Sequence, residues 1–232
     1  MVKYENTLAF SCSHLPFEHP DYLDFLVQTA RREKCTRFVH LGDITDNHAI
    51  NYHEHDPDGK SPKDEMVEAK KHLKPWFKAF PKLYVCMGNH DTMVTRKAKS
   101  TGLPSGIFKK FREMWGFPNG WEEALSWVFD DVKYMHGTNR SGRFAHLQTA
   151  HDNRKSTVMG HLHTNAGVEW TANDEDCIFG MAVGCGIDRD QYAFNYGVDF
   201  KYKPVLGCGV VYNKGAHAAF IPMDLGKKVI HI

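Results

Sequence analysis

Residues 83–91 read Leu-Tyr-Val-Cys-Met-Gly-Asn-His-Asp, a short apolar run that passes directly into a polar motif. The first five residues have the length and apolar character of a buried strand, which Gly88 ends. Asn89, His90 and Asp91 follow at the carboxyl end of that strand. Because ligands bind outside the carboxyl ends of strands in parallel α/β sheets, this unit predicts an α/β fold with a polar site at the strand ends.

Four further polar motifs lie at or beside the ends of predicted strands. These strands cover residues 6–12, 37–41, 132–135 and 157–159. The motifs are Cys12-Ser13-His14, Gly42-Asp43-Ile44-Thr45-Asp46, His136-Gly137 and Gly160-His161-Leu162-His163. Parallel strands would bring the motifs to the same edge of the fold.

Apolar residues at helical spacing predict helices at residues 20–33, 63–80 and 141–152, with a less regular helical stretch near 105–115. Pro75 has no backbone N–H, so we expect it to kink or split the second helix. After residue 163 the chain is β-rich. The strands expected there cover residues 177–183, 207–213 and 217–222.

Length and composition favour one domain over residues 1–232, with 42% hydrophobic and 25% charged residues and no internal repeat. No stretch approaches the roughly 18 apolar residues of a membrane span, and residues 1–6 lack a signal-peptide pattern. Six widely spaced cysteines without a C-x-x-C pair are typical of reduced thiols, so we expect a cytoplasmic protein. The net charge of +1 argues against a general nucleic-acid binder but leaves a local basic patch open.

The motifs supply sulfur, nitrogen and oxygen atoms of the kinds that bind transition metals. In an extended segment residues i and i+2 point the same way, so Cys12 and His14 could reach one cation, as could His161 and His163. Asp43 carries two carboxylate oxygens and could bridge two ions about 3.5–4 Å apart. The sequence therefore predicts a metal centre.

At these motifs the chain resembles the calcineurin-like metallophosphoesterases, whose pattern is D-x-H, G-D-x-x-D, G-N-H-[DE], a lone His, and G-H-x-H. The last four elements are present in order, and the resemblance covers roughly residues 8–163. Residues 48–58 and 184–188 also resemble small phosphoesterases found in bacteriophage genomes. The resemblance implies an αββα sandwich of two mixed sheets flanked by helices, with a binuclear metal centre.

The resemblance also implies a role for each motif residue. Metal one would be bound by Cys12, His14, Asp43 and His163, and metal two by Asp43, Asn89, His136 and His161. His90 matches the family's catalytic histidine, and Asp46 matches the acidic residue that orients it in some members. As alternatives, Asn89 could be a turn former and Asp46 a helix-capping or Asx-turn residue.

The sequence departs from the family pattern at position 12, where Cys12 replaces an aspartate. A thiolate is a softer ligand than a carboxylate and favours Zn or Fe over Mn or Mg. A bound cation would also lower the pKa of the thiol. Alternatively, Cys12 is a buried strand cysteine and the protein works with one tightly held ion. We expect two divalent or transition metal ions, with Zn, Fe, Mn and Ni as candidates.

The function expected from the resemblance is hydrolysis of a phosphate ester, with a phosphodiester favoured, by attack of a metal-activated hydroxide. His90 would protonate the leaving oxygen or hydrogen-bond the phosphoryl group. The substrate could be a nucleotide or a nucleic-acid end, located in the host cytoplasm if the protein is phage-encoded. The alternatives are a nuclease of the DNA-repair type and a non-catalytic metal-binding scaffold. The sequence does not indicate an oligomeric state.

Three other groups of residues have two possible interpretations each. His48, His53, Glu54 and His55 could form a third metal site, but a solvated mobile loop over residues 48–62 is favoured. Asn139, Arg140 and Arg143 could contact phosphate or lie on the surface. Trp115, Phe117 and Trp121 are expected in the core rather than as a stacking platform.

Overall fold

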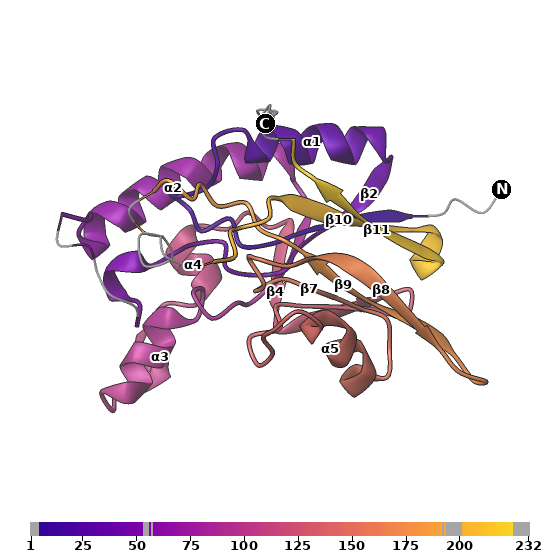
Figure 1. The fold of residues 1–232 in the computed structure, drawn as a ribbon. Helices are drawn as coiled ribbons and strands as arrows, with labels where there is room; N and C mark the ends of the chain where they lie inside the picture. Colours follow the sequence, from indigo (N-terminus) through magenta and orange to yellow (C-terminus); the bar gives the residue numbers. More distant parts are fainter. Residues whose placement is uncertain (1–4, 53–55, 57, 192, 194–200, 225–232) are drawn as a thin grey trace.

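The computed structural model describes residues 5–52, 56, 58–191, 193 and 201–224. Two β-sheets pack against each other, with helices on their outer faces (Figure 1). The first sheet has the strand order β11-β10-β1-β2-β3-β4, and the second has the order β5-β6-β7-β9-β8. Both sheets are mixed, so the αββα sandwich predicted from the sequence is confirmed.

The first sheet combines parallel strands with an antiparallel edge. Its strands are β1 (Asn6–Phe10), β2 (Cys35–His40), β3 (Leu83–Cys86), β4 (Trp121–Ala124), β10 (Gly207–Tyr212) and β11 (His217–Pro222). The first four run parallel, whereas β10 pairs antiparallel with both β1 and β11. Two helices, α1 (Tyr22–Arg32) and α2 (Pro62–Ala79), lie along the outer face of this sheet (Figure 1).

The second sheet is built in the same way from the later part of the chain. Its strands are β5 (Ser126–Phe129), β6 (Val132–Met135), β7 (Thr157–Met159), β8 (Ala166–Ala172) and β9 (Cys177–Val183). β6, β7 and β9 run parallel, and β5 and β8 are antiparallel edge strands. Helix α5 (Ala145–Asn153) covers its outer face, packed against β7 and β9. Among the described residues, no helix has the length and apolar character to cross a membrane.

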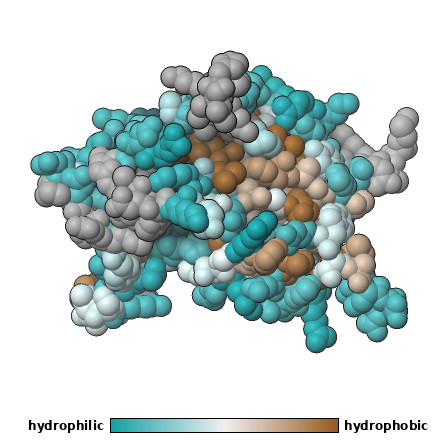
Figure 2. Space-filling model, viewed as in Figure 1, coloured by the Kyte–Doolittle hydropathy of each residue, from teal (hydrophilic) through white to brown (hydrophobic). Residues whose placement is uncertain are grey.

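Two buried apolar clusters hold the layers together. One lies between the sheets and includes Val39 of β2, Val158 of β7 and Met181 of β9. The other lies between the first sheet and its helices, and it includes Trp115, Phe117 and Trp121, so the prediction that these aromatics are core residues is confirmed. Figure 2 shows apolar side chains gathered on one face over the region where β11 meets β8 and β9, with hydrophilic residues around them.

Several elements differ from the sequence prediction. Helix α2 continues through Pro75 to Ala79 rather than splitting, because Pro75 lies close to its end and the carbonyl that loses a partner belongs to exposed Lys71. Helix α3 (Met93–Ser100) was not predicted, whereas α4 (Phe111–Trp115) lies inside the helical stretch predicted near residues 105–115. Edge strands β4, β5 and β8 were not predicted, since they are partly exposed and none of them contains a run of four or more apolar residues.

The topology brings the five motifs together. β1, β2 and β3 run parallel in one sheet, and β6 and β7 run parallel in the other. A hydrogen bond from His136 Nδ1 to the carbonyl of Leu41 (2.8 Å) joins the carboxyl ends of the two sets. The polar residues that follow these strands therefore lie at one edge of the sandwich.

Candidate metal centre

The first motif does not continue the strand as the sequence predicted. Cys12 and His14 have φ angles of 53° and 51°, in the left-handed region that few non-glycine residues adopt. Their N–H groups donate to the carbonyls of Gly42 (2.9 Å) and Asp43 (3.1 Å), so a turn tied to the second motif holds both side chains. The explanation from an extended i, i+2 pair is wrong here. It is also wrong for the fifth motif, where His161 has a φ of 66°.

The second and third motifs touch at two glycines. A Cβ atom on Gly88 would lie 2.1 Å from Asp43 Oδ1, and one on Gly42 would lie 2.8 Å from His136 Nδ1. Gly42 also has a φ of 101°, which is strained for any residue with a side chain. Both positions require glycine because the backbone approaches the polar groups of the site too closely for a side chain.

Asp43 lies at the centre of the site and is 1% exposed. Its Oδ1 accepts a hydrogen bond from the His90 N–H (2.9 Å). Its Oδ2 lies 3.0 Å from His136 Nε2 and 3.8 Å from His14 Nε2. Burial alone would raise the pKa of Asp43, but the neighbouring His136 and His90 hold it well below its ordinary value. The ionised carboxylate therefore faces ligands from both halves of the site, as a bridging residue would.

The first candidate ligand group, called here the sulfur-side group, consists of Cys12, His14 and His163. Their ligand atoms lie within 4.8 Å of one another. His14 Nδ1 donates to Asp46 Oδ1 (2.5 Å), which leaves the lone pair of His14 on Nε2. That Nε2 lies 3.2 Å from His163 Nε2. A thiol sulfur and two imidazoles thus converge on one point, which fits a soft transition-metal ion.

The second candidate ligand group, called here the amide-side group, consists of Asn89, His136 and His161. His136 Nδ1 donates to the Leu41 carbonyl, so a neutral ring carries its lone pair on Nε2. Nε2 lies 3.0 Å from both Asn89 Oδ1 and Asp43 Oδ2, an arrangement in which electron-rich atoms face each other unless a proton or a cation lies between them. Asp43 raises the pKa of His136 despite burial, which favours a proton at this place, and a bound cation would replace that proton, so the donor set fits a cation. The His161 ring lies 5.1 Å from the His136 ring.

Cys12 is buried, and its sulfur has two environments. Sγ lies 3.0 Å from Ser11 Oγ and within 4.8 Å of ligand atoms of Asp43 and His136. The same residue packs in an apolar cluster with Phe17 and other residues. Burial, followed by the charge of Asp43, raises the pKa of the Cys12 thiol well above its ordinary value. Deprotonation of this thiol therefore needs a strong local positive charge, such as a coordinated cation. The ligand role of Cys12 stays a prediction.

Asp46 and His90 are linked differently from the sequence prediction. The Asp46 carboxylate contacts His14 at 2.5 Å but lies 3.4 Å from His90 Nδ1. His90 Nδ1 instead donates to the backbone carbonyl of Asp46 (2.5 Å). Asp46 thus orients the predicted ligand with its side chain and the predicted catalytic histidine with its backbone. In both histidines the arrangement leaves Nε2 to face the site.

Asp91 has a structural role that the sequence prediction missed. Its carboxylate accepts hydrogen bonds from the N–H groups of Asp43 (2.7 Å), Ile44 (2.9 Å) and Gly88 (2.9 Å). Burial and the nearby Asp43 raise the pKa of Asp91 to about 6. Asp91 fastens the second motif to the third. The sequence did contain one indication of this role, because Asp91 is the fourth residue of the Gly88–Asp91 motif, whose other members were expected to serve the site.

The described start of the histidine-rich loop lies next to Asp46. His48 is 3% exposed in a short 3-10 helix (His48–Ile50), so the expectation of a solvated loop is wrong for this residue. Glu65 of α2 fixes the segment, accepting hydrogen bonds from the N–H groups of His48 (2.9 Å) and Ala49 (3.0 Å). Burial raises the pKa of Glu65 to about 7. Residues 53–55 lie outside the described residues.

The two arginines after the fourth motif have different surroundings. Arg140 pairs with Asp152 of α5, which fits the surface interpretation. Arg143 lines an open pocket of about 550 Å³ together with His161, His163 and Tyr202. Asn139 is exposed. The pocket adjoins both candidate ligand groups, so a substrate could enter there.

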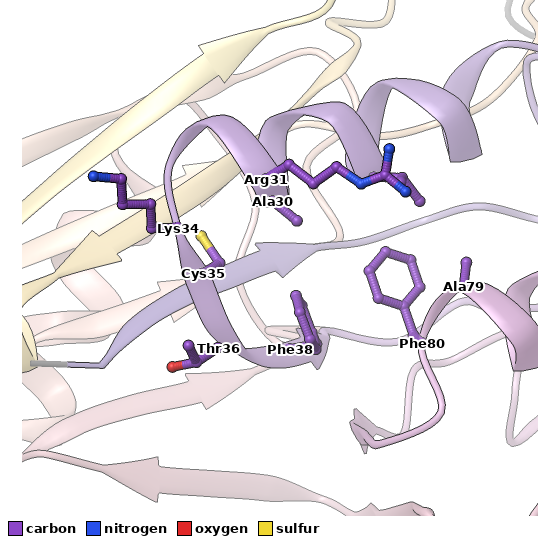
Figure 3. A pocket seen from close by; sticks show the side chains of 9 residues that line it. Ala30, Arg31, Lys34, Cys35, Thr36, Phe38, Ala79 and Phe80 are labelled. Atoms are coloured by element: carbon purple, nitrogen blue, oxygen red, sulfur yellow. The ribbon is translucent and has the colours of Figure 1, made fainter. Parts of the chain in front are cut away.

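A second pocket lies away from these groups. Figure 3 shows it between α1 and the end of α2, lined by Cys35, Phe38 and Phe80 among other residues. Cys35 begins β2, whereas the candidate ligands follow the carboxyl end of that strand. Burial raises the pKa of the Cys35 thiol to about 12, which disfavours the reactive thiolate. This pocket contributes nothing to the site.

Two mixed sheets in an αββα sandwich, with clustered histidine, carboxylate and thiol groups at the strand ends, define a metallophosphoesterase-type protein. The profile of the calcineurin-like phosphoesterase family matches residues 6–200, and the chain belongs to that family. No curated protein matches the chain.

Solved structures with the same fold have distant sequences. Vacuolar protein sorting 29 from Cryptosporidium parvum is 11% identical with a TM-score of 0.51, over 97% of this chain and 94% of that one. A metallophosphoesterase from Sphaerobacter thermophilus is 16% identical with a TM-score of 0.50, over 96% of this chain and 89% of that one. At these identities the likeness establishes the fold alone.

Proposed function

We propose that the protein is a metal-dependent hydrolase of phosphate esters, with phosphodiesters as the favoured substrates. The observation that carries the proposal is the arrangement around Asp43. One carboxylate faces the sulfur-side group and the amide-side group, and in both groups hydrogen bonds at Nδ1 leave the Nε2 lone pair of a histidine directed inward. Family membership supports phosphate-ester chemistry for such a site.

The proposed ligands are divided between two cations. Cys12, His14, Asp43 and His163 would hold one, and Asp43, Asn89, His136 and His161 would hold the other. When bound, two such ions polarise the phosphoryl oxygens and provide a hydroxide nucleophile at neutral pH. Candidate metals are Zn, Fe, Mn and Ni, with the thiol favouring Zn or Fe for the first position.

His90 is the proposed proton donor to the leaving oxygen. Its ring is 4.6 Å from that of His14, close to the proposed cations. The Asp46 carbonyl holds one proton of His90 on Nδ1. Burial opposes a second proton, but Asp43 and Asp46 raise the pKa of His90 overall, so Nε2 can carry the proton that is donated to a substrate. The open pocket beside His161 and His163 has room for the second ester group of a diester, and this supports the diester preference.

We expect the substrate to be a nucleotide or a nucleic-acid end. The six cysteines form no disulfide in the described residues, which suits the reducing cytoplasm of a cell or of a phage-infected host. We also propose that residues 1–232 act as one domain.

The test is hydrolysis of bis-(p-nitrophenyl) phosphate and p-nitrophenyl phosphate after chelation and reloading with Zn, Fe, Mn or Ni. We expect metal-dependent turnover, faster on the diester. The control variant His90→Asn should keep its metal and lose about 10²–10⁴-fold in rate. Wild-type protein that binds metal and hydrolyses neither ester would contradict the proposal and favour the scaffold alternative, for which the Cys12 replacement is the one supporting observation.

A further inference from the structure

Residues 93–112 form a strongly basic segment in a chain whose total net charge is close to zero. The whole protein has a net charge of +1, but this segment contains six basic residues and no acidic one. The six residues are Arg96, Lys97, Lys99, Lys109, Lys110 and Arg112. The positive charge is therefore concentrated in α3 and in residues 109–112, at the start of α4.

This segment begins directly beside the candidate metal centre. Helix α3 starts three residues after His90, and Arg96 Nη1 lies 3.5 Å from the carbonyl oxygen of Asn89. Lys109 and Thr95 line the same cavity, of about 390 Å³, so the two ends of the segment lie close together. In Figure 1, α3 projects from the body of the molecule beyond the end of the two sheets. A chain-like ligand bound along α3 would reach the site at Asn89.

Arg96, Lys97, Lys99 and Lys109 form no ion pair with an acidic residue in the part of the chain that the structure describes. Other arginines do pair there, since Arg37 contacts Glu5 and Asp130. Arg96 and Lys97 instead lie over the ring of Tyr52, at 5.1 Å and 4.0 Å from its centroid, and this ring is 55% exposed. Uncompensated cations beside an exposed aromatic ring are the features that bind the backbone and bases of nucleic acids.

We propose that the basic face formed by Arg96, Lys97, Lys99 and Lys109 binds the phosphate backbone of a polynucleotide and leads it to the metal centre. Lys110 and Arg112 are left out because they lie near Glu123, where their charges oppose the rise in the pKa of Glu123 that burial causes. The proposal rests on the proposed function, since it assigns a substrate class to the same site. The net charge of +1 does not exclude this binding, because a nucleic acid needs only a local basic surface, which this segment provides.

The test compares two triple variants that lose the same charge. One is Lys97→Gln, Lys99→Gln, Lys109→Gln on the basic face, and the control is Lys71→Gln, Lys74→Gln, Lys78→Gln on exposed positions of α2. Binding of a labelled single strand of about 20 nucleotides, and of the matching duplex, is measured by fluorescence anisotropy in chelator over a series of salt concentrations. Hydrolysis of bis-(p-nitrophenyl) phosphate is measured separately with metal.

We expect wild-type binding that weakens with salt, and a basic-face variant that binds at least about tenfold more weakly, with the slope of log K against log salt reduced by about 2 for single strands. The α2 variant should match wild type. Binding of either the single strand or the duplex supports the proposal and identifies the form that is bound. Equal behaviour of the two variants, or binding of neither form, would overturn it. Because binding is measured without metal, loss of ester hydrolysis alone contradicts the proposed function and leaves the binding result intact.

Discussion

The two candidate ligand groups face the same aspartate but are supported in different ways. In the sulfur-side group, His14 is oriented by a side chain, the Asp46 carboxylate at 2.5 Å. In the amide-side group, His136 is oriented by a main-chain carbonyl, that of Leu41 at 2.8 Å. The first group offers a thiol where the second offers the amide oxygen of Asn89.

This difference has two consequences. A thiol and two imidazoles form a softer donor set than an amide and two imidazoles, so the two positions should prefer different metals. A main-chain acceptor also survives any side-chain substitution, whereas the Asp46 support can be removed by one mutation. Metal binding by the amide-side group should therefore tolerate nearby substitutions better. Metal binding by the sulfur-side group should change more readily when nearby side chains are substituted.

The largest effect is expected where the two groups meet, at Asp43. Asp43→Asn removes a charge that faces both groups and gives one of its two oxygen positions to an NH₂ donor. We expect hydrolysis to fall by at least about 10³-fold and metal content to fall for both positions. Elemental analysis together with steady-state rates on bis-(p-nitrophenyl) phosphate would check this. Loss of only one metal would show that the two groups do not share this residue.

Asp46→Asn should weaken metal binding by the sulfur-side group and leave metal binding by the amide-side group unchanged. The neutral amide is a weaker partner for His14 Nδ1 and no longer raises the basicity of that imidazole, while the Leu41 support of His136 is unchanged. Loss of such a supporting partner costs about 10–100-fold in metal affinity. We expect that loss at one of two titrated sites, measured by calorimetric titration of chelated protein. An equal loss at both sites would contradict the separate support of the two groups.

Cys12→Asp should remove the chemical difference between the groups. A carboxylate in place of the thiol makes the first position harder, so its bound metal should shift from Zn or Fe towards Mn, with rates in the matching metal within about tenfold of wild type. Metal analysis and anomalous scattering at the site compare the two proteins, with Cys12→Ala as the variant that keeps no ligand. The same metal at the same occupancy in wild type and Cys12→Asp would show that Cys12 does not select it.

Much of the fold could be predicted because its central strands are apolar runs with polar ends. The strands predicted at 132–135, 157–159, 177–183 and 217–222 coincide with β6, β7, β9 and β11. Edge strands such as β8 could not be predicted in this way, because each presents partly exposed residues on both faces. Helix α3 was missed since only Met93 and Ala98 of its eight residues are buried, too few to mark an apolar face.

The site was predictable as a set of residues but not as a geometry. The ordered motifs identified side chains that the structure brings together around Asp43. The left-handed backbone at Cys12 and His14 left no sequence signal, because these residue types rarely adopt it. The hydrogen bonds of Asp91 and the Asp46–His14 contact could not be predicted either, because they join loops that are distant in sequence. Metal-ligand roles for all seven residues stay predictions.

The smallest effect concerns Glu65, which holds the segment that follows Asp46 on the sulfur side. Burial raises the pKa of Glu65 to about 7 in the folded protein, above its value of 4.5 in an unfolded chain. The native state therefore binds this proton more tightly, and the stabilisation is fully present below pH 4.5 and lost as the pH rises through 7.

Urea unfolding of chelated protein measures this effect. The free energy of unfolding of wild type should fall by on the order of 2 kcal/mol relative to that of Glu65→Gln between pH 5 and pH 8. Glu68→Gln, in the same helix but only partly buried beside Lys60, is the matched control and should run parallel to wild type. If Glu65→Gln also runs parallel, the buried carboxyl does not titrate in this range, and the support behind Asp46 does not depend on pH.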